Sequence, residues 1–158
     1  MKLDVSCDLP CELFQARSAV KTLGLLNHVA SPIMKFDPVE LLSEHESLET
    51  RPYVMKTKLF GWLPLGLHTM DFSYIDAEGS FTMRDNGYSA LCKKWDHKMS
   101  FTTKESGLLY RDRADIRAGA LTPFVWLFAF CFYKHRQHRW KRLAIHNFQA
   151  LNVGSESC

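Results

Sequence analysis

Three polar side chains interrupt rows of apolar residues that are expected to form the dry faces of β-strands. They are His68, His97 and Asp112, and each shares its strand face with a large apolar residue two positions away. An imidazole and a carboxylate within reach of each other can act as base and acid, or can orient a polar group of a bound molecule. Alternatively, they are core residues that satisfy each other, because burying such a group without a partner costs about 1–3 kcal/mol.

The turn signal after Lys104 predicts which of these side chains meet. A two-residue turn there sets His97 opposite Ala114 and diagonal to Asp112. We therefore expect a contact between His97 and Asp112, in which the carboxylate raises the pKa of the imidazole. His97 and Asp112 are the candidate catalytic pair on this interpretation.

His68 belongs to a different predicted hairpin. The turn signal at 76–79 predicts His68 opposite Gly87, and Asp85-Asn86-Gly87 reads as a further turn. This arrangement puts His68 at the far end of its hairpin, so His68 and His97 are not expected to form a dyad.

Cys131, His135 and His138 follow the i, i+4, i+7 spacing that places zinc ligands on one helix face. Basic neighbours crowd this face and no carboxylate lies nearby in the sequence, so we expect an amphipathic helix and no metal site. Cys7 and Cys11 have no partner pair and receive the same interpretation. The sequence contains no Gly-rich phosphate loop and no nucleophile elbow, and no cofactor is expected.

The elements that position these residues follow from hydrophobic periodicity. The period is close to 2 over residues 2–8 and 53–117, with turn signals between the runs, which predicts an antiparallel sheet with one wet and one dry face. The remaining N-terminal part reads as short helices at 11–17 and 18–28, a strand at 33–36, and a loop or short exposed helix at 37–50.

The period lengthens to that of a helix after Thr122, which reads as an N-cap followed by a proline. The pattern predicts one helix of about 25 residues, or about 37 Å, that ends near Phe148. A helix of this size is needed to cover the dry face of the sheet, and a gap between the two suits apolar ligands. The fold class is thus α+β, with a single domain over 1–150 and a tail over 151–158.

The chain holds 11 Phe, 5 Tyr and 4 Trp, and most of these rings fall on the sheet face or the helix start. Rings fill a core well, whereas methionine adapts to variable contents, so this face is either core or the wall of a cavity. The candidate ligand-binding residues are Tyr53, His68, Met70, Phe72, Tyr74, Phe81, Met83, Trp95, His97, Met99, Phe101, Tyr110, Asp112, Phe124 and Phe128.

The start of the long helix is apolar nearly all round, since Trp126, Phe130 and Tyr133 lie off its main apolar face. The two short helices, the acidic 37–50 segment, a second subunit or a membrane could cover these rings. Cover by the chain itself is the simplest, and a homodimer comes next. The basic segment 134–142 is a solvated helix end, or contacts an anionic head group, an acidic membrane surface or RNA.

Composition narrows the class of protein. The net charge of +3 is too small to imply a nucleic-acid partner. The longest apolar run, Leu121–Tyr133, has 13 residues, and a membrane-spanning helix needs about 20. The N-terminus has no run of signal-peptide length, so we expect a soluble, cytoplasmic protein with reduced cysteines.

The element order over nearly the whole chain resembles the START-like superfamily (SRPBCC), whose birch-pollen-allergen-like members have the helix-grip fold. Trp95-Asp96-His97 is similar to a late strand of cyclase/dehydrase-type members. Residues 110–115 and 132–140 look like the last strand and the closing helix. The resemblance implies a curved sheet of about seven strands around the C-terminal helix, and a deep pocket for a lipid, a polyketide or another hydrophobic ligand.

Three functions follow as hypotheses. The superfamily includes carriers, sensors and enzymes, so the resemblance alone does not imply catalysis. The first hypothesis is a carrier or sensor of a hydrophobic small molecule. The second is a cyclase/aromatase- or hydratase-type enzyme that uses His97 and Asp112 as acid and base. The third is a module that docks on a membrane or a protein through the aromatic and basic helix.

Overall fold

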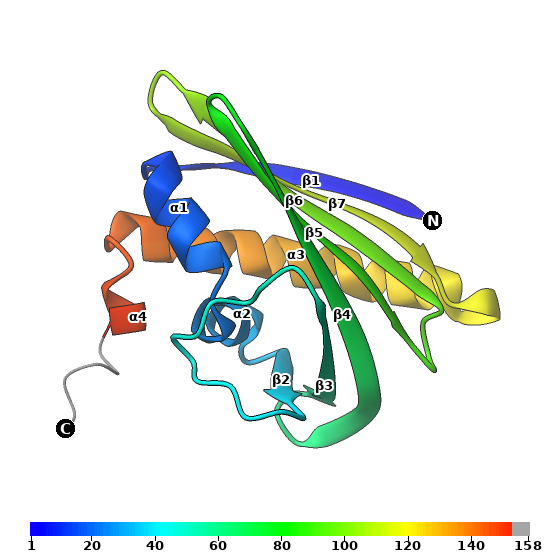
Figure 1. Ribbon diagram of the computed structural model, residues 1–158. Helices are drawn as coiled ribbons and strands as arrows, with labels where there is room; N and C mark the ends of the chain where they lie inside the picture. The colour runs from blue at the N-terminus through cyan, green and yellow to red at the C-terminus, as the bar shows by residue number, and fades with distance from the viewer. Residues whose placement is uncertain (153–158) are drawn as a thin grey trace.

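The computed structural model describes residues 1–152. Seven antiparallel strands form one curved sheet in the order β1-β7-β6-β5-β4-β3-β2 (Figure 1). The strands are β1 (Lys2–Leu9), β2 (Met34–Pro38), β3 (Pro52–Leu59), β4 (Leu63–Ala77), β5 (Ser80–Ser89), β6 (Lys94–Lys104) and β7 (Gly107–Arg117). Alternating burial along β5, β6 and β7 gives the sheet the dry inner face that the period predicted.

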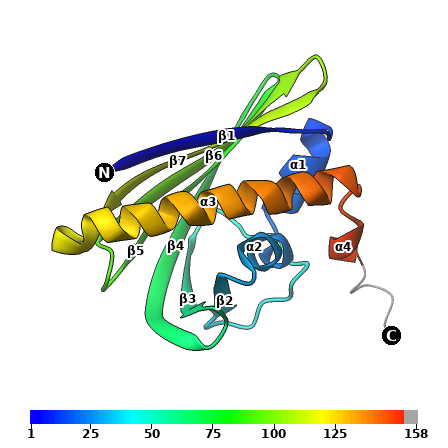
Figure 2. The same ribbon diagram turned by 180° about the vertical axis from the view of Figure 1, so that it is seen from behind.

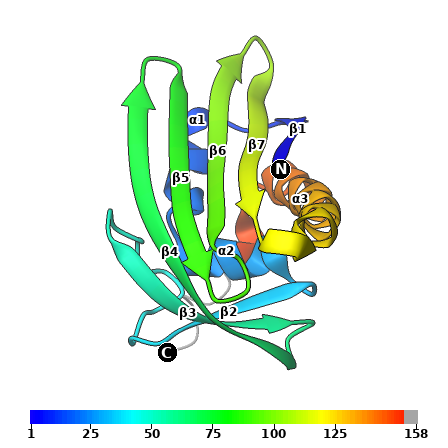
Figure 3. The same ribbon diagram turned by 90° about the vertical axis from the view of Figure 1, so that its right-hand side faces the viewer.

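The helices lie on the inner side of this sheet. They are α1 (Leu13–Val20), α2 (Leu23–Ala30), α3 (Thr122–Ile145) and the short α4 (Gln149–Asn152). The long helix α3 runs across the sheet in Figure 2, and it packs against β1, β7 and α2. The view along α3 in Figure 3 shows the sheet bending away from the helix toward β2 and β3.

This architecture confirms the predicted fold class: α+β, seven strands, two short helices after the first strand and a long C-terminal helix. The single domain over 1–150 stays a prediction, and most of the predicted tail, 153–158, lies outside the described residues. Over residues 1–152, no helix combines the length and the apolar character that crossing a bilayer requires.

The β6–β7 register matches the prediction. Lys104 pairs with Gly107 and His97 lies opposite Ala114. The β4–β5 register is shifted by two residues, because the hairpin turns at Glu78-Gly79 and pairs Ala77 with Ser80. A two-residue shift leaves every side chain on its predicted face.

The turn predicted at Asp85-Asn86-Gly87 is wrong, because β5 continues through these residues to Ser89. His68 lies opposite Ser89, and not opposite Gly87 as predicted. A Cβ at Gly87 would lie 2.6 Å from His68 Nε2 and 2.9 Å from the Thr69 carbonyl oxygen. The glycine therefore serves the close approach of β4, a role that a sequence pattern cannot separate from a turn.

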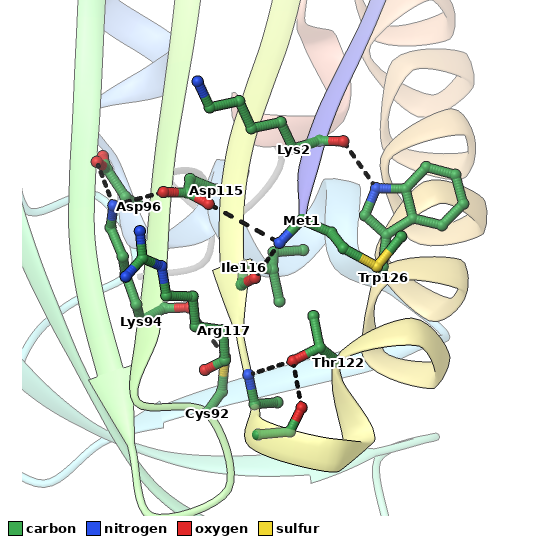
Figure 4. A network of polar contacts seen from close by, with 12 residues as sticks. Met1, Lys2, Cys92, Lys94, Asp96, Asp115, Ile116, Arg117, Thr122 and Trp126 are labelled. Carbon is green, nitrogen blue, oxygen red and sulfur yellow. Dashed lines mark hydrogen bonds and ion pairs between the residues drawn. The ribbon is translucent and has the colours of Figure 1, made fainter.

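The N-cap of helix α3 lies one residue earlier than predicted. Leu121 occupies the N-cap and Thr122 is already helical. The Thr122 hydroxyl accepts a hydrogen bond from the Ala118 amide at 2.9 Å and donates to the Gly119 carbonyl at 2.7 Å, which fixes the turn before the helix (Figure 4). The helix ends three residues before the predicted end.

Strand β1 covers part of the aromatic helix start. Trp126 Nε1 donates to the Lys2 carbonyl at 2.9 Å, as Figure 4 shows. Tyr133 is fully buried and its hydroxyl accepts a hydrogen bond from Trp95 Nε1 at 2.9 Å. Phe130 stacks on Trp126 and stays 37% exposed. Trp126 is thus covered by the chain itself, through the first strand and not through the predicted helices or acidic segment.

Candidate functional site

A cavity of about 310 Å³ lies between the sheet and α3. Its walls come from α1, α2 and α3 and from every strand between β2 and β6. The volume falls at the lower end of the range of small-molecule sites, and the lining is mostly apolar with few polar groups.

Eight of the candidate ligand-binding residues line this cavity: His68, Met70, Phe72, Met83, Trp95, His97, Met99 and Phe128. They come from β4, β5 and β6 and from α3. That they bind a ligand stays a prediction.

The other seven candidates lie elsewhere. Phe124 is 74% exposed on the first turn of α3. Asp112 is buried but does not line the cavity. The remaining five, which lie in or against the hydrophobic core and do not line the cavity, are Tyr53, Tyr74, Phe81, Phe101 and Tyr110. Alternation assigns a residue to a face, but the packing of helices on that face decides where a space remains.

The predicted contact between His97 and Asp112 is confirmed. His97 Nε2 lies 2.8 Å from Asp112 Oδ1, which also accepts the Tyr110 hydroxyl at 2.8 Å. Gln137 Nε2 of α3 donates to Asp112 Oδ2 at 3.0 Å. Because Asp112 is fully buried behind these donors, it reaches a ligand only through His97.

Asp112 raises the pKa of His97 as predicted, but the net shift of this pKa is downward. Burial of the ring lowers the pKa, and this effect outweighs the neighbouring Asp112 carboxylate, which raises it. His97 is therefore a neutral imidazole at neutral pH. With Nε2–H directed at Asp112, its other nitrogen is the acceptor, which suits a base or a hydrogen-bond acceptor for a ligand.

Asp85 is a cavity residue that the sequence interpretation missed. It faces the cavity from β5, directly opposite His97 on β6. Its Oδ1 accepts the Asp71 amide at 3.0 Å, and burial raises the pKa of its carboxyl to about 8. The alternation that begins at Phe81 places Asp85 on the dry face, but the turn signal concealed this pattern.

His68 lines the cavity beside Asp85. Its Nε2 lies 2.6 Å and Asp85 Oδ1 lies 3.1 Å from the place that a Cβ at Gly87 would occupy, so the two polar groups converge there. Burial lowers the pKa of His68 to about 4, and the ring is neutral at neutral pH. His68 and Asp85 can therefore exchange hydrogen bonds with a ligand without bringing charge to the cavity.

Arg136 of α3 is the second cavity residue that was missed, because it was assigned to the solvated basic segment. It is 5% exposed and lines the cavity. Its Nη2 lies 3.3 Å from Met99 Sδ, and its Nε has no hydrogen-bond acceptor among the described residues. Helical spacing from Phe128 and Phe132 to Arg136 is the signal that places it on the inner face.

The candidate metal ligands are dispersed. Cys131 is exposed, and His135 Nε2 lies 2.7 Å from the Ser31 carbonyl oxygen. Burial raises the pKa of the Cys7 and Cys11 thiols to about 11. Within residues 1–152, no group of three or more His, Cys, Asp or Glu side chains could hold a metal ion.

Comparison with known proteins places the fold. No family model matches the chain, and no curated protein matches its sequence. Among solved structures, Ara h 8.0201 is similar at a TM-score of 0.63 and 10% identity, with 92% of this chain and 98% of that chain covered.

Two further structures show the same likeness. A norcoclaurine synthase point mutant of Thalictrum flavum, solved with a transition-state analogue, is similar at a TM-score of 0.61 and 8% identity, over 92% of this chain and 94% of that chain. An AHSA1-like protein of Aeromonas hydrophila is similar at a TM-score of 0.60 and 12% identity, over 96% and 95%. At such identities the likeness concerns the fold alone, and the arrangement of strands and helices in this chain is the helix-grip fold.

Proposed function

We propose that the protein binds a hydrophobic small molecule in the cavity between the sheet and α3, as a carrier or a sensor. The observation that carries this proposal is an apolar cavity of about 310 Å³ in the middle of the domain. The norcoclaurine synthase structure supports it, because that protein has a similar fold and is in complex with a small molecule, a transition-state analogue.

The chemistry of the walls suits an amphipathic ligand. Met70, Met83 and Met99 supply flexible apolar contacts that adjust to irregular shapes. His68 and His97 supply neutral polar groups at neutral pH, which can orient a polar end of the ligand. Such a combination of apolar walls and a few polar groups is the usual composition of a ligand site.

The test is to purify the protein from its native host and identify small molecules released by organic solvent with mass spectrometry. We expect a co-purified hydrophobic compound. A Val125→Trp variant fills the cavity from α3 and should lose it, whereas Leu127→Trp, on the exposed side of the same helix, should retain it. The proposal fails if the purified protein carries no small molecule and if the two variants bind added hydrophobic compounds equally well.

A catalytic role is the second candidate, favoured by the 2.8 Å contact between His97 and Asp112 at the cavity wall. In this case neutral His97 takes a proton from the bound molecule, and Asp112 stabilises the imidazolium that forms. With the compound identified by mass spectrometry as substrate, His97→Ala should abolish turnover and leave its affinity unchanged. Unaltered turnover in His97→Ala would exclude this role.

A further inference from the structure

Arg136 presents a buried positive charge. Its guanidinium stays protonated in proteins, and only 5% of the residue is exposed. Taking such an ion out of water costs several kcal/mol unless a counter-charge and hydrogen-bond acceptors replace the solvent. A buried arginine therefore needs partners from the fold or from a bound molecule.

The described residues do not supply those partners. Arg136 forms no ion pair within 4.0 Å among them, and its Nε has no acceptor. Its hydrogen bond to Met99 Sδ engages a weak acceptor, and its guanidinium also lies over the rings of Phe132 and Tyr133 on its own helix. The N–H groups of the Arg136 guanidinium are therefore largely without strong hydrogen-bond acceptors among the described residues.

The two nearest carboxyl groups are already engaged. Asp112 accepts three hydrogen bonds, from His97, Tyr110 and Gln137. Asp85 accepts the Asp71 amide, and burial raises the pKa of its carboxyl to about 8, which keeps it protonated at neutral pH. The Asp112 carboxylate favours the charged form of Arg136 through space, but neither carboxyl forms an ion pair with it.

The cavity thus offers one cation and otherwise neutral walls. Arg136 lines it together with His68 and His97, whose rings are neutral at neutral pH, and with protonated Asp85. A cationic ligand would meet like charge, and a purely apolar ligand would leave the Arg136 Nε–H without an acceptor. An anion would gain charge-assisted hydrogen bonds that are about twice as strong as neutral ones.

We propose that the ligand is a monocarboxylic acid with an apolar body, and that its carboxylate binds the unused guanidinium donors of Arg136 inside the cavity. This inference rests on the proposed ligand-binding function and names the class of ligand. A carboxylate matches the single charge and the planar fork of arginine. A phosphate monoester carries a charge of about −1.5 to −2 and would leave part of it uncompensated.

The test compares each acid with its isosteric amide. Decanoate and decanamide, and naphthalene-2-carboxylate and naphthalene-2-carboxamide, are titrated into the full chain at pH 7 by calorimetry. We expect at least one acid to bind about tenfold or more tightly than its amide. If both amides bind as tightly as their acids, the role of Arg136 is overturned and the binding function stays intact. If none of the four compounds binds, both proposals fail.

Variants locate the preference. Arg136→Met conserves much of the apolar volume and should bring the acid-to-amide ratio to about one. Lys134→Met removes the same charge from an exposed position of the same helix and should leave the ratio unchanged. A preference that survives in Arg136→Met, or is lost in Lys134→Met, contradicts the assignment.

A measurement on the wild-type protein keeps the test independent of the folding of these variants. In ¹⁵N-labelled protein, the buried Arg136 Nε–H should shift and exchange more slowly with the acid, because a carboxylate then accepts its hydrogen bond. The amide should cause a smaller change. Equal changes with both compounds would overturn the proposal.

Discussion

His97 Nε2 and Asp112 Oδ1 lie 2.8 Å apart, although their backbones are diagonal and not paired across β6 and β7. The contact links the cavity wall to a carboxylate that is fully buried behind it. Because Asp112 also holds Tyr110 and Gln137, it ties two strands and α3 together at this point.

Asp112→Asn should lower the free energy of unfolding by about 1–3 kcal/mol. The amide retains the shape but replaces one acceptor with a donor, so one buried donor among His97, Tyr110 and Gln137 loses its partner. Urea unfolding at pH 7 measures the change. Asp112→Ala, which removes both acceptors, serves as the comparison and should cost more. Unchanged unfolding of Asp112→Asn would contradict the buried network.

The buried, neutral ring of His68 should make the protein less stable in weak acid. Its pKa is lowered to about 4 by burial, so the native ring stays neutral while the unfolded ring takes a proton below its ordinary value near 6.5. The free energy of unfolding should therefore fall as the pH drops from about 6.5 to 4. His68→Gln should reduce this slope in urea unfolding at pH 7, 5.5 and 4.5. Parallel slopes in both proteins would argue against a buried neutral ring.

The buried carboxyl of Asp85 should have the opposite effect, a loss of stability as the pH rises. Its pKa is raised to about 8 by burial, so between about pH 4 and 8 the native carboxyl keeps a proton that the unfolded chain releases. This group makes the protein less stable as the pH rises through that window, by at most about 1.4 kcal/mol per pH unit.

Asp85→Asn should remove this dependence, because the amide oxygen still accepts the Asp71 amide and carries no charge. The variant should gain stability relative to the wild type between pH 5 and pH 8, in denaturant or thermal unfolding. A constant difference between the two proteins over this range would show that Asp85 does not titrate there.

Gly87→Ala should destabilise the protein by about 1–3 kcal/mol, as overpacking does in a filled region. The added methyl would lie 2.6 Å from His68 Nε2 and 2.9 Å from the Thr69 carbonyl oxygen. The loss should be smaller in a His68→Ser background, where only the backbone contact remains. Thermal unfolding of the four proteins checks this, and equal losses in both backgrounds would exclude the contact with His68.

The sequence sufficed for the element order, for the faces of the strands and for the contact between His97 and Asp112. Period and turn chemistry are local properties, and a two-residue turn after Lys104 is enough to set the register of β6 against β7. The same reasoning went wrong at Asp85-Asn86-Gly87, because a glycine that admits a neighbouring strand has the same signature as one that makes a turn.

A dry sheet face covered by a long helix could be predicted from the sequence alone, since side-chain alternation and helical period need no knowledge of distant residues. Where that face is core and where it is cavity depends on the tertiary structure: Phe101 and Tyr110 stack on each other and pack against Trp140, while Met83 and Met99 line the cavity. The tertiary structure also shows that Arg136, which was predicted to lie on a solvated helix end, is a buried charge. Burial depends on which elements meet across the fold, and that is a property of long-range packing.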